Sequence, residues 1–536
     1  MLGIQWGERL RAKVQRHPMA DAAAAALLLE ELPFKRPAKV LAESTAWLES
    51  VEAEATFGRA HRMKIVSLID GATRASLEEL TRTYAGAGHG APGQASDWRT
   101  LMAYLDCLGG AYRAILDADP DAPGASLGAS LPALACRMMR AIACSMKVSW
   151  MRYLPPDRAS WEALVHAYRA AQMHNCAETL VMAYPSDTER TCAQHELAVA
   201  AMFAAASPES LNPRRVELVY RITSSCRSAF TTGSGNEGGR RHYLVNLDQP
   251  SAPVRIPEQL AESAGWMFFH ADKVEPRLRA LREQSRSGTA GIPDLGTEFA
   301  ASEIEHAIEH VLRFWDDSPP ARREPRTRIN TKVQVELGIQ AIREALESAD
   351  ARLNPASEPR IVMEGVGPET AQTEQSRGTP IPWTLTDYSA RGVGVRCARR
   401  VDPWLRIGVV IGVRLERSEK WSVAVVRRIR TDARNQTDVG AQLLTRSAEL
   451  VTLEGPPSPA TSPRSNGGGA VVHSRALLLP DDAQHYIRAS LLFEPGTNAP
   501  EQTFVLRQGD SARHIRLHEA DEVLDGWERV EFDGLD

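Results

Sequence analysis

The hydrophobic pattern of this 536-residue chain changes period once, and that change limits the folds available to it. Up to about residue 317, apolar residues recur at steps of three and four, as in Leu101, Tyr104 and Leu108, which is the spacing of one face of a helix. After the proline-rich and charged stretch 316–325, short β-branched segments follow one another instead. The sequence therefore predicts a multidomain α+β protein, helical at first and β-rich afterwards.

The length also requires several folding units, because single hydrophobic cores stop growing at about 250–300 residues. Residues 1–317 are expected to form a helical bundle or solenoid, with a glycine-rich hairpin insertion near 227–256. Residues 318–454 are expected to form an antiparallel β-barrel and residues 470–536 a small C-terminal β appendage. Between them, residues 455–469 have the composition of a linker, with too few apolar side chains to pack.

Composition excludes several classes of protein. The net charge of −5 gives no overall attraction to nucleic acid, and the apolar run 22–29 is too short to span a bilayer. Seven cysteines without a CxxC pair fit the reduced thiols of a cytosol. We therefore expect a cytoplasmic protein with no nucleic-acid partner and no membrane insertion. The segment from Arg391 to Arg434 carries twelve Lys or Arg against four acids and could face a phosphate.

Two short motifs flank the first predicted strands. The first is RREPRTR, which contains Arg322, Arg323, Arg326 and Arg328, and the second is DYSARG, which contains Asp387, Ser389 and Gly392. The pair resembles the PilZ family, which carries an RxxxR loop before its first strand and a D/NxSxxG motif on the following strand turn. Residues 439–444 (VGAQLL) resemble the strand that ends a PilZ barrel, so the resemblance covers roughly residues 320–452.

This resemblance implies a PilZ-type β-barrel that binds the bacterial second messenger cyclic di-GMP through those seven residues, with no catalytic residue, metal or cofactor. A helical region of this length resembles the larger PilZ proteins linked to type IV pili and surface attachment. The expected function is thus a receptor that changes conformation or partner binding, and that acts on pili, motility or biofilm formation through an unidentified protein partner.

The chemistry of these residue types suits such a ligand. Guanine presents N7 and O6 as adjacent acceptors, with which the fork of an arginine can pair, and the guanidinium plane can also stack on the base. Asp387 can accept from guanine N1–H and N2–H, Ser389 can donate to a phosphate, and Gly392 lets the backbone turn closely beneath the ligand. The hypothesis requires Arg326 and Asp387 to converge in space.

Alternatives remain open at this stage. Counting back from the first strand can also pair Arg328 with Glu324, which would degrade the arginine motif, and the stretch 338–382 is longer than a PilZ barrel needs. A ligand-independent scaffold with a degenerate barrel is the second hypothesis. An enzymatic interpretation rests on His306-x-x-Glu309-His310, which matches a zinc motif but lacks an evident third ligand. We expect no enzyme.

Overall fold

In the computed structural model the chain forms two compact units, Met1–Ala321 and Arg322–Asp536. The structure describes residues 17–535 except for 88–90, 92, 119–126, 234–242, 257–264, 288–291, 293–294, 317–323, 354–382, 399–404, 417, 456–471, 483–487, 495–500, 510 and 525. Among the described helices, none has both the length and the apolar character needed to cross a bilayer.

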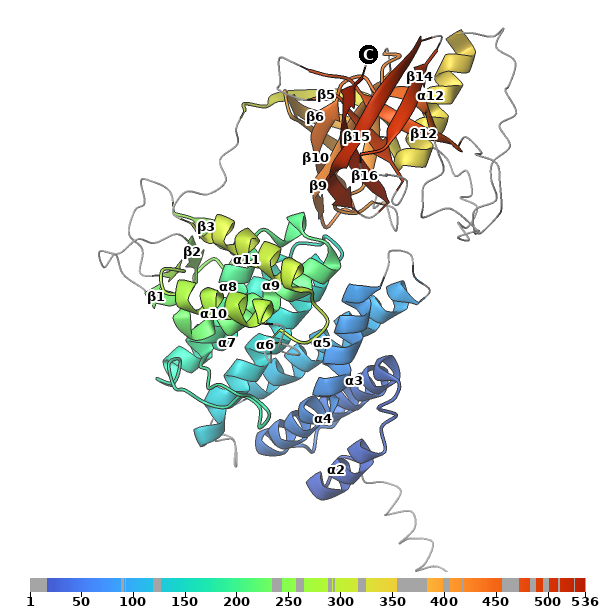
Figure 1. Cartoon of the computed structure of the whole chain (residues 1–536). Coiled ribbons are helices and arrows are strands. Elements are labelled where there is room, and N and C mark those ends of the chain that lie inside the picture. Colours follow the sequence, from blue (N-terminus) through green and yellow to red (C-terminus); the bar gives the residue numbers. More distant parts are fainter. Residues whose placement is uncertain are drawn as a thin grey trace, which may run out of the picture. The chain divides into compact units, whose positions relative to one another are not determined.

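The first unit consists mainly of helices that pack side by side (Figure 1). Its described helices are α2 (Ala22–Glu30), α3 (Pro37–Ala53), α4 (Arg59–Gly86), α5 (Gln94–Asp117), α6 (Leu131–Trp150), α7 (Arg158–Met173), α8 (Ala193–Ala205), α9 (Pro213–Ser225), α10 (Glu275–Arg286) and α11 (Ala301–Trp315).

Local sequence explains where these helices begin and which face they bury. The Asp157 carboxylate accepts a hydrogen bond of 2.9 Å from the backbone N–H of Ser160, which caps the N-terminus of α7. Leu101, Tyr104 and Leu108 of α5 are all buried. The period of three and four residues therefore identified the face of α5 that packs into the core.

A four-stranded antiparallel sheet covers part of the helical unit. Its strands are β1 (Thr231–Gly233), β2 (Tyr243–Asn246), β3 (Val254–Arg255) and β4 (Trp266–His270), in the order β1-β4-β2-β3. The glycine-rich segment 234–242 lies outside the described residues. Phe269 of β4 and Val245 of β2 are buried in the core that the helices share, so the sheet belongs to the first unit.

The second unit begins with a closed six-stranded antiparallel barrel in the order β10-β7-β6-β5-β8-β9. Its strands are β5 (Thr327–Leu337), β6 (Trp383–Ser389), β7 (Gly392–Cys397), β8 (Val410–Leu415), β9 (Ser422–Thr431) and β10 (Thr437–Thr445). Pairing of β9 with β10 closes the ring. The predicted antiparallel barrel is confirmed, and residues 439–444 lie on β10, its last strand.

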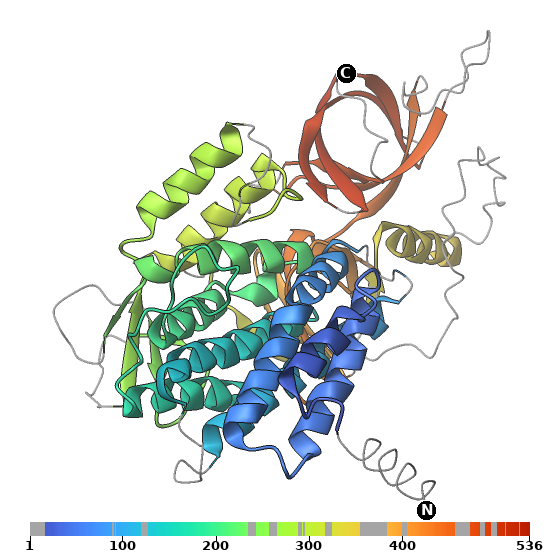
Figure 2. The ribbon, with the colours of Figure 1, turned by 90° about the horizontal axis from the view of Figure 1, so that it is seen from below.

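The C-terminal region forms a second closed barrel, in the order β11-β12-β13-β16-β15-β14, which Figure 2 shows as a ring. Its strands are β11 (Glu449–Gly455), β12 (Val472–Leu479), β13 (Ser490–Phe493), β14 (Thr503–Gln508), β15 (Ser511–Leu524) and β16 (Trp527–Gly534). Phe493, Phe504 and Leu506 are among the side chains that fill it. The region predicted as a small appendage thus supplies five of the six strands of a barrel with its own core, and β11 comes from the stretch that the sequence assigned mainly to the first barrel.

One apolar core joins the two barrels. Helix α12 (Ile339–Leu353) follows β5 and packs Ile342 against Trp421 of the first barrel and Trp527 of the second. The Trp527 indole Nε1 also donates a 2.7 Å hydrogen bond to the carbonyl oxygen of Gly408. Since a buried indole N–H needs an acceptor, this bond lets the large side chain be buried without an unpaired donor.

We expect Trp527→Ala to lower the free energy of unfolding of the second unit by about 3–5 kcal/mol, because it leaves a large cavity and an unpaired carbonyl. Hydrogen exchange measured by mass spectrometry on the full chain should show lost protection in β8, β9 and β16 and little change in α3 to α6. Val523→Ala is the control, since Val523 is 61% exposed on the same barrel. Equal protection in both variants would contradict a shared core.

Candidate functional site

The hairpin of β6 and β7 carries the acid-hydroxyl motif. Ser389 and Gly392 are cross-strand partners on either side of a two-residue loop. Arg446, just after β10, donates from Nη2 to the carbonyl oxygens of Ser389 and Ala390 at 3.1 and 3.3 Å. The turn is therefore held by a hydrogen-bond donor from a third strand, which fixes the Ser389 end of the motif.

A β-bulge turns Asp387 toward the outside of the first barrel. Leu385 pairs with Val395 and Asp387 pairs with Gly394, so Thr386 has no partner on β7. Val395 is 1% exposed and faces the interior, whereas Gly394 shares its face with the exposed Arg396. Because successive residues of a strand point to opposite faces, the extra residue moves Asp387 from the interior to the outer surface.

Glycine at position 394 is required by the close approach of this carboxylate. A Cβ atom built on Gly394 would lie 2.6 Å from Oδ2 of Asp387 and 2.8 Å from its Oδ1. No real side chain tolerates such a contact, so any residue larger than glycine would displace Asp387. The sequence analysis missed this position, although a glycine inside a strand is a known signal of close approach.

The arginine motif meets this hairpin from the start of β5. Nη1 of Arg326 lies 2.5 Å from Oδ1 of Asp387, and its Nη2 lies 3.5 Å from the place that a Cβ of Gly392 would occupy. The Ser389 hydroxyl is 3.5 Å from the same place. The structure thus brings Arg326, Asp387, Ser389 and Gly392 together on one outer surface.

Of the other three arginines of the motif, the structure describes Arg328 alone. Arg328 is the cross-strand partner of Asp387, and directly opposed residues of an antiparallel pair share a face. Arg322 and Arg323 lie outside the described residues. The direct ion pair is made by Arg326, so the register that contains Arg326 contacts the acidic motif.

Beside Asp387, the outer surface crosses β7 and β10 over glycines. Gly394 pairs with Gly440, and Gly440 pairs with Arg428, so two adjacent glycines separate Asp387 from a guanidinium. In the neighbouring row, Gly392 pairs with Gln442. A glycine-lined surface bordered by an acid, a hydroxyl and arginines can accept a flat, polar, negatively charged ligand.

The proposed zinc motif has a structural role instead. Nε2 of His310 lies 2.7 Å from the carbonyl oxygen of Ala206. Burial is the main reason why the pKa of His310 falls to about 4, which keeps the ring neutral at ordinary pH. Within the described part of the chain, no group of three or more His, Cys, Asp or Glu residues could hold a metal ion.

Comparison with known families identifies both units. The model described as "Cyclic-di-GMP receptor FimW, N-terminal domain" matches residues 22–233, and that described as "Cyclic-di-GMP receptor FimW, middle PilZ domain" matches residues 339–449. The chain belongs to the FimW family of cyclic di-GMP receptors. The predicted membership of the PilZ receptors is confirmed. No curated protein matches the chain.

The FimW match covers the acid-hydroxyl motif of the candidate site but not its arginine motif. The middle PilZ domain, residues 339–449, contains Asp387, Ser389 and Gly392, together with the missed Gly394. Arg326 and Arg328 precede the matched residues, so their part in the site rests on geometry. The helical unit, which the sequence left without an assignment, contains the FimW N-terminal domain.

We expect Gly394→Ala to weaken cyclic di-GMP binding by about tenfold, which corresponds to about 1.4 kcal/mol, because the new methyl group displaces the Asp387 carboxylate. Calorimetric titration of the purified full chain measures the change. If displacement is the cause, adding Gly394→Ala to Asp387→Ala should cost no further affinity. Additive losses in the double variant would contradict this explanation.

Proposed function

We propose that this chain binds cyclic di-GMP on the outer surface of its first barrel and regulates surface attachment, pili or motility in response. The observation that carries the proposal is the contact of Arg326 with Asp387 above Gly392. A guanine needs both an arginine fork for N7 and O6 and an acceptor for N1–H and N2–H. On this surface Arg326 and Asp387 can supply these two groups, and they lie in contact with each other. Ser389 supplies a hydroxyl beside them.

The ion pair between Arg326 and Asp387 must open, at least in part, when the ligand binds. The two side chains are 30% and 27% exposed, and ion pairs with access to water contribute only about 0–1 kcal/mol. Replacing that contact with charge-assisted bonds to a base or phosphate is therefore favourable. In this proposal the pair keeps both side chains oriented until the ligand binds, and Arg328, the cross-strand partner of Asp387, adds positive charge nearby.

The position of the arginine motif suggests how binding acts on the rest of the protein. The boundary between the two compact units falls between Ala321 and Arg322, so Arg326 lies just inside the second unit. A ligand that replaces the ion pair of Arg326 with Asp387 therefore changes how the chain is restrained where it arrives from the helical unit. A messenger can shift the arrangement of the units only by its different affinity for the two arrangements, and this restraint would supply such a difference.

A second route leads from the same surface to the second barrel. Arg427 donates from Nε to Oε1 of Gln442 at 3.0 Å, and its Nη2 lies 2.6 Å from Oε1 of Glu522 on β15. Because Gln442 is the cross-strand partner of Gly392, a ligand above Gly392 would touch this chain of contacts. We propose that the second barrel senses occupancy of the first through Arg427.

The cytoplasmic location that we propose is supported by thiol chemistry. All seven cysteines are thiols that form no disulfide, and four of them, Cys136, Cys192, Cys226 and Cys397, are almost completely buried. Burial raises the pKa of the Cys107 thiol, for example, to about 11, so this side chain stays protonated and unreactive. This use of cysteine suits a reducing compartment.

We expect Arg326→Ala and Asp387→Ala each to weaken cyclic di-GMP binding by about 1–3 kcal/mol, or roughly 5- to 150-fold, because each removes one good contact to a base. Isothermal titration of the full chain measures the loss. Arg488→Ala is the matched control, because Arg488 is 79% exposed on the second barrel. Unchanged affinity in both site variants would overturn this site, whereas no binding by the wild-type chain would favour a ligand-independent scaffold.

We expect Glu522→Gln to uncouple the second barrel without removing the messenger site, because the substitution keeps the shape and removes the charge that Arg427 contacts. Hydrogen exchange of β15, with and without cyclic di-GMP, measures the coupling. Glu519→Gln, at an exposed position of the same strand, serves as the control. An equal response of β15 in the wild type and in Glu522→Gln would exclude this route.

A further inference from the structure

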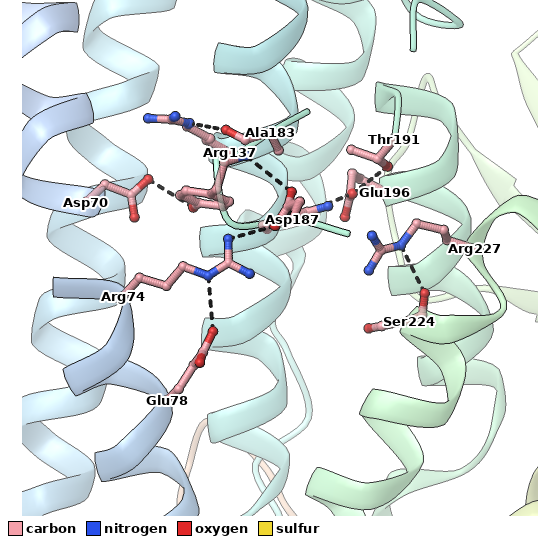
Figure 3. Close-up of polar contacts among 12 residues, drawn as sticks. Asp70, Arg74, Glu78, Arg137, Ala183, Asp187, Thr191, Glu196, Ser224 and Arg227 are labelled. Carbon is pink, nitrogen blue, oxygen red and sulfur yellow. Dashed lines mark hydrogen bonds and ion pairs between the residues drawn. The ribbon is translucent and has the colours of Figure 1, made fainter. Parts of the chain in front are cut away.

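The helical unit contains a cavity of about 460 Å³ whose walls carry charged side chains. Arg74 comes from α4, Arg140 and Lys147 from α6, Glu217 from α9, and Asp187 from the segment between α7 and α8. Figure 3 shows Arg74 and Asp187 pointing toward each other between the helices. Small-molecule sites commonly have volumes of about 300–1,000 Å³, so the cavity can hold a nucleotide-sized ligand.

Asp187 holds one wall of the cavity together. Its Oδ1 lies 2.9 Å from Nη1 of Arg74 and its Oδ2 lies 2.7 Å from Nη1 of Arg140. Burial alone would raise the pKa of Asp187, but Arg140 and Arg74 outweigh burial and lower it. Nε of Arg140 is in turn 2.9 Å from Oε1 of Glu196. Helices α4, α6 and α8 are therefore tied together by charges that face the cavity.

Glu217, on α9, also forms ion pairs with two basic side chains that line the cavity. Lys147 Nζ lies 2.7 Å from its Oε2, and Nε of Arg221 lies 2.7 Å from its Oε1. Glu217 and Lys147 are both buried, so the pair cannot be solvated by bulk water. Removing one partner of such a pair leaves an uncompensated buried charge, so this pair ties α6 to α9 beside the cavity.

At the cavity, Arg140 and Arg227 each have N–H groups for which the described part of the chain offers no acceptor. In the described part of the chain, Nη2 of Arg140 is buried and has no hydrogen-bond partner. Arg227 uses only Nε, which donates to the carbonyl oxygen of Ser224 at 2.9 Å, and among the described residues no carboxylate is paired with it. Figure 3 shows Arg227 opposite Asp187 and Glu196, with its terminal nitrogens pointing inward.

The buried acids that line the cavity are paired or hydrogen-bonded, whereas among the described residues no carboxylate is paired with Arg227. Asp70 accepts from the hydroxyls of Tyr112 and Tyr184 at 2.5 and 2.9 Å, and burial raises its pKa, which favours the neutral form. Glu189, at the rim, is exposed and its charge is screened by water. The cavity therefore presents an excess of unused N–H donors over unused acceptors.

We propose that this cavity is a second ligand site, separate from the first barrel, which binds the phosphoryl group of a nucleotide-sized molecule between Arg140 and Arg227. Guanidinium forks pair with phosphate oxygens through two parallel N–H bonds, and this pairing would occupy the unused donors. The phosphoryl group could belong to a free mononucleotide or to cyclic di-GMP itself. The proposal does not depend on the site of the first barrel.

The test uses the purified full chain and two probes, GMP and cyclic di-GMP, in calorimetric titrations. The key variant is Arg227→Gln, which removes the unpaired charge while leaving the ion pairs of Arg140 intact. Arg158→Gln is the matched control, since Arg158 is 69% exposed on α7 of the same unit. Circular dichroism melting curves check that each variant remains folded. We expect Arg227→Gln to weaken GMP binding at least tenfold and Arg158→Gln to leave it unchanged.

A second background separates the two possible occupants. In Asp387→Ala, which impairs the site of the first barrel, residual cyclic di-GMP binding that Arg227→Gln abolishes would identify the messenger as the occupant of the cavity. GMP binding that needs Arg227 while cyclic di-GMP shows no residual binding would support a separate nucleotide. Binding of GMP that is equal in the wild type and in Arg227→Gln, or absent from both together with no Arg227-dependent binding of cyclic di-GMP, overturns the proposal.

Discussion

The bulge at Thr386 determines that the Asp387 carboxylate lies on the outer surface of the first barrel. Without the extra residue on β6, the strict alternation of a strand would send the Asp387 carboxylate into the apolar interior with Leu385. With it, the carboxylate lies on the outside, above a glycine of the next strand and within 2.5 Å of Arg326. The contact between segments more than sixty residues apart thus depends on a local irregularity of one strand.

The grouping of the motif residues was predictable because they lie close together in the sequence. The residues that surround them in the folded barrel were not predictable. Asp387, Ser389 and Gly392 fall within six positions, and the sequence places them on one turn. Gly394, Gly440 and Arg446 act through strand pairing, which a single sequence does not specify. The choice between Arg326 and Arg328 likewise depends on where β5 begins relative to β6, and only the folded register settles it.

In the second barrel and in the helical unit too, local patterns were predictable whereas long-range pairing was not. The second barrel closes by pairing β11 with β14, strands with some fifty residues between them, so the short alternating segments alone suggested only an appendage. In the helical unit, periodicity identifies the apolar faces but does not show which charged residues point inward. Lys147 stands in an apolar stretch of α6 and is buried against Glu217 of α9, a partner that no spacing in the sequence indicates.

The way in which the barrels are joined constrains how a signal can leave the first one. Trp421, Trp527 and Ile342 share one apolar core, and close-packed cores do not deform continuously. In the proposed receptor, a signal therefore leaves the first barrel by a route other than a change in that core. The groups that can respond at small cost are the partly exposed ones at its edges: Arg326 at the start of the unit, and Arg427 between Gln442 and Glu522. Exposed ion pairs are weak, and for that reason a bound phosphate can rearrange them.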